Sequence, residues 1–397
     1  YIQSVAECSD GGYIVGGDFR SSSIDLGNGV SLTNKVVSGS DDGMVIKYSS
    51  TGEVEWAKGI GGTDYDDINS VAETTDGGYI LGGYFDSRSI DLGNGVSLTN
   101  KGSNDGMVIK LEKTELPNST VIRAQGIGGT GNDQINSVAE TNDGGYIVGG
   151  DFTSSTIDLG NGISIINIGK KDGMLVKYNS NEEVEWVKVI GSTGDDSIAS
   201  IAVTSDGGYI VGGTFKSSKI ELENGVNLES RYYSKYDTGM LIKYSANGEL
   251  EWAKAIGGNY YDYITSVIGT KDGGCIATGF FGSGSISLEN GIVLKNQSSS
   301  DDGMIIKYNT NGVIEWAKGI GGTSDEYIET VSETSDGGYI VGGDFQGSRI
   351  DLGNGKVLNN KSSSGKADGM LLKYNVDGEI EWAKGIGGTS DEYIETV

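Results

Sequence analysis

The 397-residue sequence contains no histidine, one proline and two cysteines. Without histidine it lacks the usual general base and the commonest transition-metal ligand, and a Ser-His-Asp or Cys-His catalytic arrangement is excluded. Cys8 and Cys275 lie in different copies of the repeat described below, so we expect no disulfide between them. No apolar run of about 20 residues and no signal peptide is visible, so we expect no direct membrane insertion.

Positive charge is also scarce, because 29 Lys and Arg face 56 Asp and Glu, a formal net charge of −27. Phosphate binding needs clustered Lys and Arg, so nucleic acid and anionic membrane surfaces are not expected partners. An acidic surface instead attracts cations or basic partners. Hydrophobic residues make up 36% of the chain, enough for a core, and 68 glycines indicate short strands joined by tight turns.

The dominant feature of the sequence is a repeat, read from the isoleucine of "INSVAET". Each copy predicts four strands, typified by "INSVAET" (68–74), "YILGGYF" (79–85), "GMVIKYS" (43–49) and "EVEWAKGIGG" (53–62). The insert "SRSIDLGNGVSLTN" (87–100) predicts an extra hairpin, whose Asn94-Gly95 tolerates the positive φ of a type I′ turn. Four strands in so long a repeat are typical of propeller blades rather than solenoids. We therefore predict an all-β fold, a β-propeller of six blades of four antiparallel strands with an extra β-hairpin per blade.

The predicted blades form a single repeat domain, and a short stretch is left over at the end. Residues 394–397 duplicate the start of a repeat, so we expect a loose overhang or a strand that pairs with a further copy. Because the chain also opens within a repeat, we expect it to be part of a longer protein. The predicted blades are residues 2–67, 68–134, 135–197, 198–263, 264–327 and 328–393.

The residues also resemble a known family. "DGMVIKYSSTGEVEWAKGIGG" followed by "DDINSVAETTDGGYILGGYF" is similar to the repeats of the bacterial seven-bladed β-propeller (SBBP-like) family, and the likeness covers essentially the whole chain. The insert "IDLGNGVSL" replaces the family's Phe-Pro, and six copies do not match the family's blade number. The resemblance implies a propeller fold and a secreted or cell-surface bacterial protein.

Acidic loops such as "TDYDDI" and "TSDEYI" precede the first strand of the repeats. If these loops lie at the channel mouth, their last carboxylates form a ring that suits a hard cation such as Ca²⁺. The alternative is that they cap turns and keep the surface soluble. The candidate metal ligands are Asp66, Asp133, Asp196, Asp262, Glu326 and Glu392.

Copy four departs from the repeat in two tyrosine-rich loops, "ESRYYSKYD" (229–237) and "NYYDY" (259–263). Propeller topology predicts that both loops emerge on the same face. Tyrosine combines a flat apolar ring with a hydroxyl, which suits protein hot spots and sugars alike; ordinary loop drift is the alternative. The candidate ligand-binding residues are Arg231, Tyr232, Tyr233, Tyr236, Tyr260, Tyr261 and Tyr263.

Three recurring residues have simpler interpretations. The Asp of "DGG" predicts a hairpin turn. The recurring Trp of "EWAK" predicts blade packing, with a sugar-stacking platform as the alternative. The Lys of "IKY" keeps its place where the "VAET" glutamate is replaced, so we expect backbone or another acid to satisfy it.

The sequence leaves several functions open. The first is a non-catalytic, extracellular bacterial scaffold or adhesion module that binds a protein or glycan on a cell surface. The alternatives are a multivalent lectin-like propeller, an enzyme acting on polysaccharide through one acidic pair, and a monomer that assembles into an array through its terminal strand.

Overall fold

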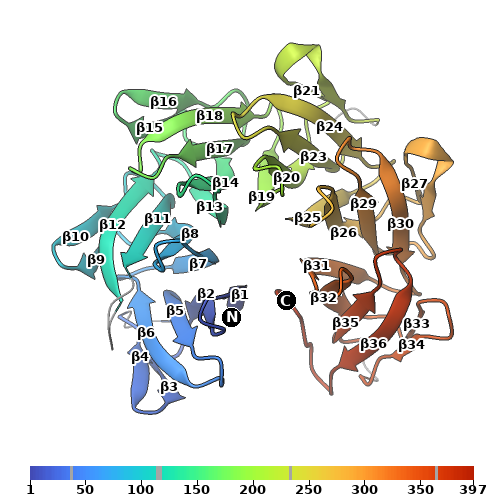
Figure 1. The fold of residues 1–397 in the computed structure, drawn as a ribbon, viewed down its shortest axis with the longest axis horizontal. Helices are drawn as coiled ribbons and strands as arrows, with labels where there is room; N and C mark the ends of the chain where they lie inside the picture. Colours follow the sequence, from blue (N-terminus) through green and yellow to red (C-terminus); the bar gives the residue numbers. More distant parts are fainter. Residues whose placement is uncertain (36–38, 113–118, 232–234, 363–364) are drawn as a thin grey trace. The chain divides into compact units, whose positions relative to one another are not determined.

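The computed structural model describes residues 1–35, 39–112, 119–231, 235–362 and 365–397 (Figure 1). The fold is the predicted all-β propeller, with six four-stranded antiparallel blades and six two-stranded hairpins in the described part of the chain. Three blades form each of two compact units, Tyr1–Ile190 and Gly191–Val397, called unit 1 and unit 2 below. Among the described residues no helix has the length and apolar character needed to cross a membrane.

Unit 1 contains the first three blades, in which consecutive strands pair side by side. The blades consist of β1 (Ile2–Glu7), β2 (Tyr13–Phe19), β5 (Asp42–Tyr48) and β6 (Val54–Ile60); β7 (Asp66–Glu73), β8 (Tyr79–Phe85), β11 (Asp105–Glu112) and β12 (Thr120–Ile127); and β13 (Asp133–Glu140), β14 (Tyr146–Phe152), β17 (Asp172–Tyr178) and β18 (Val184–Ile190).

Unit 2 repeats the same strand order in the last three blades. These blades consist of β19 (Asp196–Val203), β20 (Tyr209–Phe215), β23 (Thr238–Tyr244) and β24 (Leu250–Ile256); β25 (Asp262–Gly269), β26 (Cys275–Phe281), β29 (Asp302–Tyr308) and β30 (Ile314–Ile320); and β31 (Glu326–Glu333), β32 (Tyr339–Phe345), β35 (Asp368–Tyr374) and β36 (Ile380–Ile386).

The predicted extra hairpin is present in every blade and lies against the fourth strand. Its turn has the predicted positive φ, 52° at Asn94 and 77° at Gly95, as the Asn-Gly pair requires. In unit 2 the turns of blades 4 and 5 include the short 3-10 segments η1 (Glu223–Gly225) and η2 (Glu289–Gly291). The hairpin strands are β3 (Ser23–Gly27), β4 (Val30–Thr33), β9 (Ser89–Gly93), β10 (Val96–Thr99), β15 (Thr156–Gly160), β16 (Ile163–Ile166), β21 (Lys219–Glu221), β22 (Asn227–Glu229), β27 (Ser285–Ser287), β28 (Val293–Lys295), β33 (Arg349–Asp351) and β34 (Val357–Asn359).

Within each unit the hydrophobic core lies between consecutive blades. Gly82 of β8 shows why the second strand needs a glycine, because a Cβ there would lie 2.5 Å from Val138 and 2.7 Å from Ile135 of the next blade. Ile135 is fully buried by this contact, and burying one such side chain stabilises the fold by about 1.5–3 kcal/mol.

Three of the repeated tryptophans, Trp56, Trp252 and Trp316, pack against the next blade. Trp252 of β24 lies 5.9 Å from Tyr308 of the next blade, and Trp316 of β30 lies 5.9 Å from Tyr339. Where blade 2 has Arg123 instead of tryptophan, the Arg123 Nε lies 3.0 Å from a carboxylate oxygen of Glu182 in blade 3. Glu182 has a φ of 63° at a turn position where blades 1, 4, 5 and 6 have glycine. The two substitutions, arginine for tryptophan and glutamate for glycine, therefore form one ion pair between blades.

The lysine of "IKY" is buried and bound to the acids around it, as predicted. Lys307 donates to Asp272 at 2.8 Å and to the Tyr308 carbonyl at 3.2 Å, and its Nζ lies 3.1 Å from Glu315. Burial alone would raise the pKa of Asp272, but hydrogen bonds from Lys307 and Thr270 lower it. The "DGG" aspartate therefore shapes its turn and also neutralises a buried ammonium group. The equivalent lysines are Lys47, Lys110, Lys177, Lys243 and Lys373.

The end of the chain is not a loose overhang in the structure, which was the first of the two alternatives that the sequence left open. Residues 391–397 form no strand, but they lie on blade 6 where the first strand of a further blade would lie. A Cβ on Gly342 would come within 2.8 Å of Ile394 and 2.9 Å of Val397, as Gly82 meets Ile135 and Val138. The Glu392 N–H also donates to the Ala367 carbonyl at 2.9 Å. We call residues 391–397 the packed tail.

We predict that Asp272→Ala lowers the free energy of unfolding by about 1–2 kcal/mol, because it leaves the buried Lys307 with fewer acceptors. The lower part of the usual range applies because the Asp272 side chain is half exposed. Urea unfolding followed by tryptophan fluorescence measures the change. Adding Lys307→Met should recover part of the loss; a double variant as unstable as the single one would contradict the explanation.

We predict that Ile394→Asp loosens blade 6, because it places a charge against Gly342 at a cost of about 1–2 kcal/mol. Hydrogen exchange of β32 amides should become faster, and the Tm should fall. Val376→Asp is the matched control, since Val376 is 54% exposed in a turn of the same blade. Equal exchange in both variants would show that the tail does not pack on blade 6 in solution.

Candidate functional site

Five of the six predicted carboxylate ligands, all except Glu392, are buried inside their own blades and not at a solvent-facing mouth. Asp66, at the start of β7, is fully buried, and its Oδ2 accepts hydrogen bonds from the Gly62 N–H at 2.8 Å and the Ser87 hydroxyl at 2.6 Å. Asp133, Asp196 and Asp262 make the same contacts with Ser154, Ser217 and Ser283. Each carboxylate thus closes the loop before its strand, the capping role that the sequence left open.

Glu326 shows how this loop accommodates a different residue pair. Where the other loops have serine, blade 6 has Gly347, and a Cβ there would lie 2.8 Å from Glu326 Oε1. The longer glutamate therefore occupies the space of the missing hydroxymethyl group. Burial raises the pKa of Glu326 to about 8, above the value of about 6 for Asp66 and Asp262. Glu392 repeats the loop in the packed tail, where it accepts from the Gly388 N–H at 3.1 Å.

These carboxylates are not gathered into a metal site. Throughout the described parts of the chain, no group of three or more Cys, Asp or Glu side chains is placed to hold a metal ion. Their hydrogen bonds run to backbone and serine of their own blade.

The structure brings together four of the candidate tyrosines of copy four. The Tyr236 ring lies 4.8 Å from Tyr260 and 5.1 Å from Tyr261, and Tyr261 stacks on Tyr263 at 6.5 Å. Lys235 Nζ lies 4.8 Å from the centre of the Tyr236 ring. Arg231 points elsewhere and donates to the Ser287 carbonyl of the blade 5 hairpin at 3.1 Å. Tyr232 and Tyr233 lie outside the described residues.

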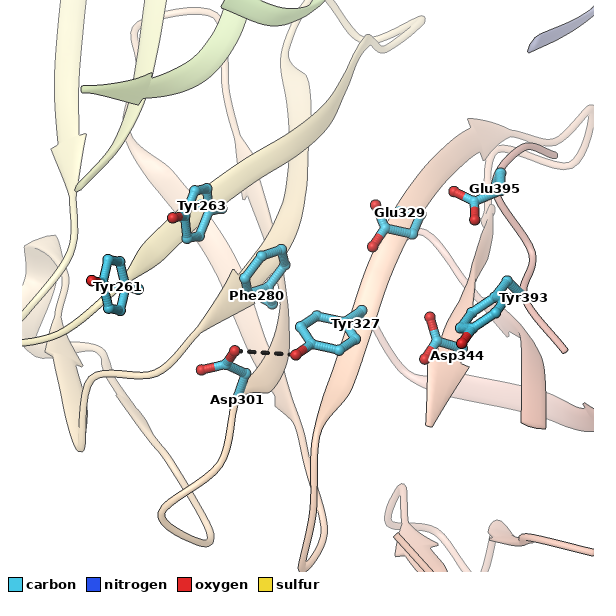
Figure 2. Close-up of a pocket in the computed structure, with 9 residues that line it drawn as sticks. All are labelled: Tyr261, Tyr263, Phe280, Asp301, Tyr327, Glu329, Asp344, Tyr393 and Glu395. Atoms are coloured by element: carbon cyan, nitrogen blue, oxygen red, sulfur yellow. Dashed lines mark hydrogen bonds between the residues drawn. The ribbon is translucent and has the colours of Figure 1, made fainter. Parts of the chain in front are cut away.

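The row of rings continues into blades 5 and 6. Phe280 lies 4.8 Å from Tyr263 and 4.7 Å from Tyr327, and the Tyr327 hydroxyl donates to Asp301 at 3.3 Å. The rings from Tyr261 to Tyr327 line part of a pocket of about 570 Å³ within unit 2. We call it the aromatic-acidic pocket (Figure 2). It is lined by Tyr261, Tyr263, Phe280, Asp301, Tyr327, Glu329, Asp344, Tyr393 and Glu395.

The acids of this pocket are held in an unfavourable environment. Burial raises the pKa of Asp344 to about 7, and the neighbouring carboxylates of Glu329 and Glu395 add to the effect. Burial and Glu395 likewise raise the pKa of Glu329 to about 7. Asp344 is only 3% exposed, and its Oδ2 has no hydrogen-bond partner in the part of the chain that the structure describes. A pocket of this kind favours a positively charged ligand.

Sequence reasoning reached Tyr261 and Tyr263 but missed the rest of the pocket. A signal was present, because tyrosine precedes the aligned isoleucine at Tyr263, Tyr327 and Tyr393, as it does at Tyr1, whereas blades 2, 3 and 4 have Asp67, Gln134 and Ser197 there. In the loops of Tyr327 and Tyr393 the repeat pattern draws attention to the carboxylate one residue earlier, Glu326 or Glu392. The tyrosine positions face the pocket, whereas the carboxylate positions face the blade interior.

Comparisons with known proteins give one sequence relative and several distant folds. No family model matches the chain. An uncharacterized WD repeat-containing protein, L264, of Acanthamoeba polyphaga mimivirus is 21% identical over 262 residues, which is 57% of this chain. The matched part is 19% of that protein, so the chain spans well under a quarter of the relative's length.

Solved structures resemble the chain only loosely. Sqt1 from Chaetomium thermophilum is 10% identical with a TM-score of 0.34, covering 86% of this chain and 93% of that chain. A eukaryotic initiation factor is 6% identical with a TM-score of 0.35, covering 99% and 89%. The extracellular domain of the one-component system BT4673 from B. thetaiotaomicron is 11% identical with a TM-score of 0.21, covering 100% and 55%.

We predict that Asp344→Asn raises the Tm at pH 8 and has little effect at pH 4. The pKa of Asp344 is higher in the folded than in the unfolded chain, so between about pH 4 and pH 7 the folded state holds a proton that the unfolded state has released. Its contribution to stability therefore falls as the pH rises through this window. Each kcal/mol of stabilisation raises the Tm of a unit of this size by about 2–4 °C, so we expect a gain of at least that size at pH 8.

Thermal melts at both pH values measure the difference. Asp64→Asn is the matched control because Asp64 is exposed. A gain of equal size at pH 4 and pH 8 would contradict a charged, unpartnered Asp344.

Proposed function

We propose that the protein is a non-catalytic propeller that recognises a protein partner through the aromatic surface of unit 2. The observation that carries this proposal is the continuous row of rings from Tyr236 through Tyr261 to Tyr327, with neighbouring centroids 4.7–6.5 Å apart. Such a row combines apolar area with hydroxyl groups, and tyrosine is enriched at the hot spots of protein interfaces. Its exposed end is formed by Tyr260, which is 44% exposed.

The comparisons favour a binding role in a general way. The sequence relative is described as a WD repeat-containing protein, and propellers of that kind are rigid scaffolds for other proteins. The resemblance to the bacterial seven-bladed repeat family supports a secreted or cell-surface protein that acts as a scaffold or adhesion module. The absence of histidine and the near-equal blades support a role without catalysis.

A multivalent lectin is less well supported. It would present similar exposed aromatics in every blade. At the pocket-facing position, however, blades 2, 3 and 4 have Asp67, Gln134 and Ser197, where blades 1, 5 and 6 have Tyr1, Tyr263 and Tyr327. An aromatic residue at this place therefore does not recur in every blade.

The test is a binding screen of the full chain against panels of cell-surface proteins and glycans, with calcium and then with a chelator. We expect saturable binding to a protein that Tyr260→Ser weakens about tenfold or more, as loss of an interface hot spot does. Tyr65→Ser is the matched control, because Tyr65 is 45% exposed and belongs to the equivalent loop in unit 1. Binding to glycans alone, or equal loss in both variants, would contradict the proposal.

A further inference from the structure

The repeat offers an internal comparison for Asp344. Asp151 occupies the same position in the second strand of blade 3, and its carboxylate has hydrogen-bond and ion-pair partners within its own blade. Its Oδ2 accepts hydrogen bonds from Gln134 and Asn136, each at 3.1 Å. Lys171 Nζ lies 3.5 Å from its Oδ1. Two amide donors and one ammonium group thus satisfy a carboxylate that is 3% exposed.

Blade 6 has the same carboxylate without these partners. The residues at the places of Gln134, Asn136 and Lys171 are Tyr327, Glu329 and Ala367. Asp344 is equally buried, at 3% exposed, but its Oδ2 has no hydrogen-bond partner among the described residues. Blade 6 has therefore replaced a positive charge by alanine and an amide by a second acid, and it has opened a pocket of about 570 Å³ beside them.

The lining of the aromatic-acidic pocket defines the chemistry of the missing partner. Figure 2 shows the carboxyl group of Asp344 between the rings of Tyr327 and Tyr393, with Glu329 near them. Carboxylates repel an anion, and the described side chains do not form a group that could hold a metal ion. Ring faces attract an organic cation and accept its carbon atoms at the same time. Rings of this cluster already lie near ammonium groups of the chain itself, Tyr236 near Lys235 and Tyr261 near Lys216.

We propose that the aromatic-acidic pocket binds one alkylammonium group, with its charge against Asp344 and Glu329 and its carbon atoms against Tyr327 and Tyr393. The group takes the place that Lys171 occupies next to Asp151. Two sources carry this chemistry, a lysine side chain of a protein partner and a free small amine. Only the lysine source rests on the proposed protein recognition, since a free amine would bind the pocket without any protein partner.

The first experiment is calorimetric titration of the full chain with choline at pH 8, above the pKa of about 7 to which burial raises Asp344 and Glu329. The comparison ligand is 3,3-dimethylbutan-1-ol, which has the shape of choline without its charge. We expect choline to bind at one site at least about tenfold more tightly than the neutral alcohol, since it gains both charge pairing and ring contacts. Equal binding of the two compounds, or no binding of choline at millimolar concentration, would overturn the proposal.

Two variants locate the site. Asp344→Asn keeps the shape of the side chain, and we expect it to weaken choline binding about tenfold or more. The double variant Tyr327→Gln with Glu329→Asn installs the amide donors of blade 3, so it should satisfy Asp344 internally, keep the fold and lose choline binding. Asp64→Asn removes an exposed charge in unit 1 and should leave the affinity unchanged. Unaltered affinity in both pocket variants would overturn the assignment.

A third titration separates the two sources. Nα-acetyl-lysine methylamide stands for a lysine side chain in a protein, and its Nε-acetylated form is the neutral control. Tighter binding of the lysine compound than of choline would assign the pocket to a lysine of a partner, and the reverse would assign it to a free amine. Because these probes are small molecules, their binding does not depend on the Tyr260→Ser result, so the pocket and the protein-recognition proposal can fail separately.

Discussion

The close approach of consecutive blades is the constraint on which the rest of the structure depends. Gly82 leaves no room for a side chain between β8 and the isoleucine and valine of the next blade, so neighbouring blades bury apolar side chains directly against each other. This explains why the packed tail is ordered. Gly342 of blade 6 likewise has no side chain, and Ile394 and Val397 pack against it although residues 391–397 form no strand. A repeat protein whose units cannot bury their own faces will accept any chain segment that carries the matching residues.

A second set of contacts fixes the loop that leads into the first strand of a blade. The carboxylate at the start of the first strand accepts hydrogen bonds from its own loop and from serine, as Asp66 does, and buried carboxylates are tolerated only with such partners. Since this role uses one residue of each loop, the residue after it is free to vary. It is aspartate at position 67, glutamine at 134 and tyrosine at 263 and 327. A binding function in this fold is therefore expected at the variable residue that follows the buried carboxylate.

Much of the fold could be predicted because the signals are local. The four strands, the Asn94-Gly95 turn, the tryptophan packing and the satisfaction of the "IKY" lysine all follow from short stretches of sequence. The candidate site was harder to predict for two reasons. A bulge lies between Ile68 and Ser70, and again in most first strands, so simple alternation does not show which residues face the pocket. The pocket also joins side chains from Tyr261 to Glu395, which no single repeat contains.

The comparison of Asp151 with Asp344 shows how a repeat can acquire a binding site at a defined cost. The two blades share their backbone pairing at this point, with Gln134 opposite Asp151 and Tyr327 opposite Asp344. Any difference between the sites therefore comes from side chains alone. In blade 3 the carboxylate stabilises the fold through its amide and ammonium partners. In blade 6 the same carboxylate is buried among other acids, an arrangement that destabilises the folded chain above neutral pH. A buried charged group without a partner in the protein is expected where a ligand provides that partner. In blade 3 the charged partner of the carboxylate is an ammonium group, so a positively charged ligand is expected in blade 6.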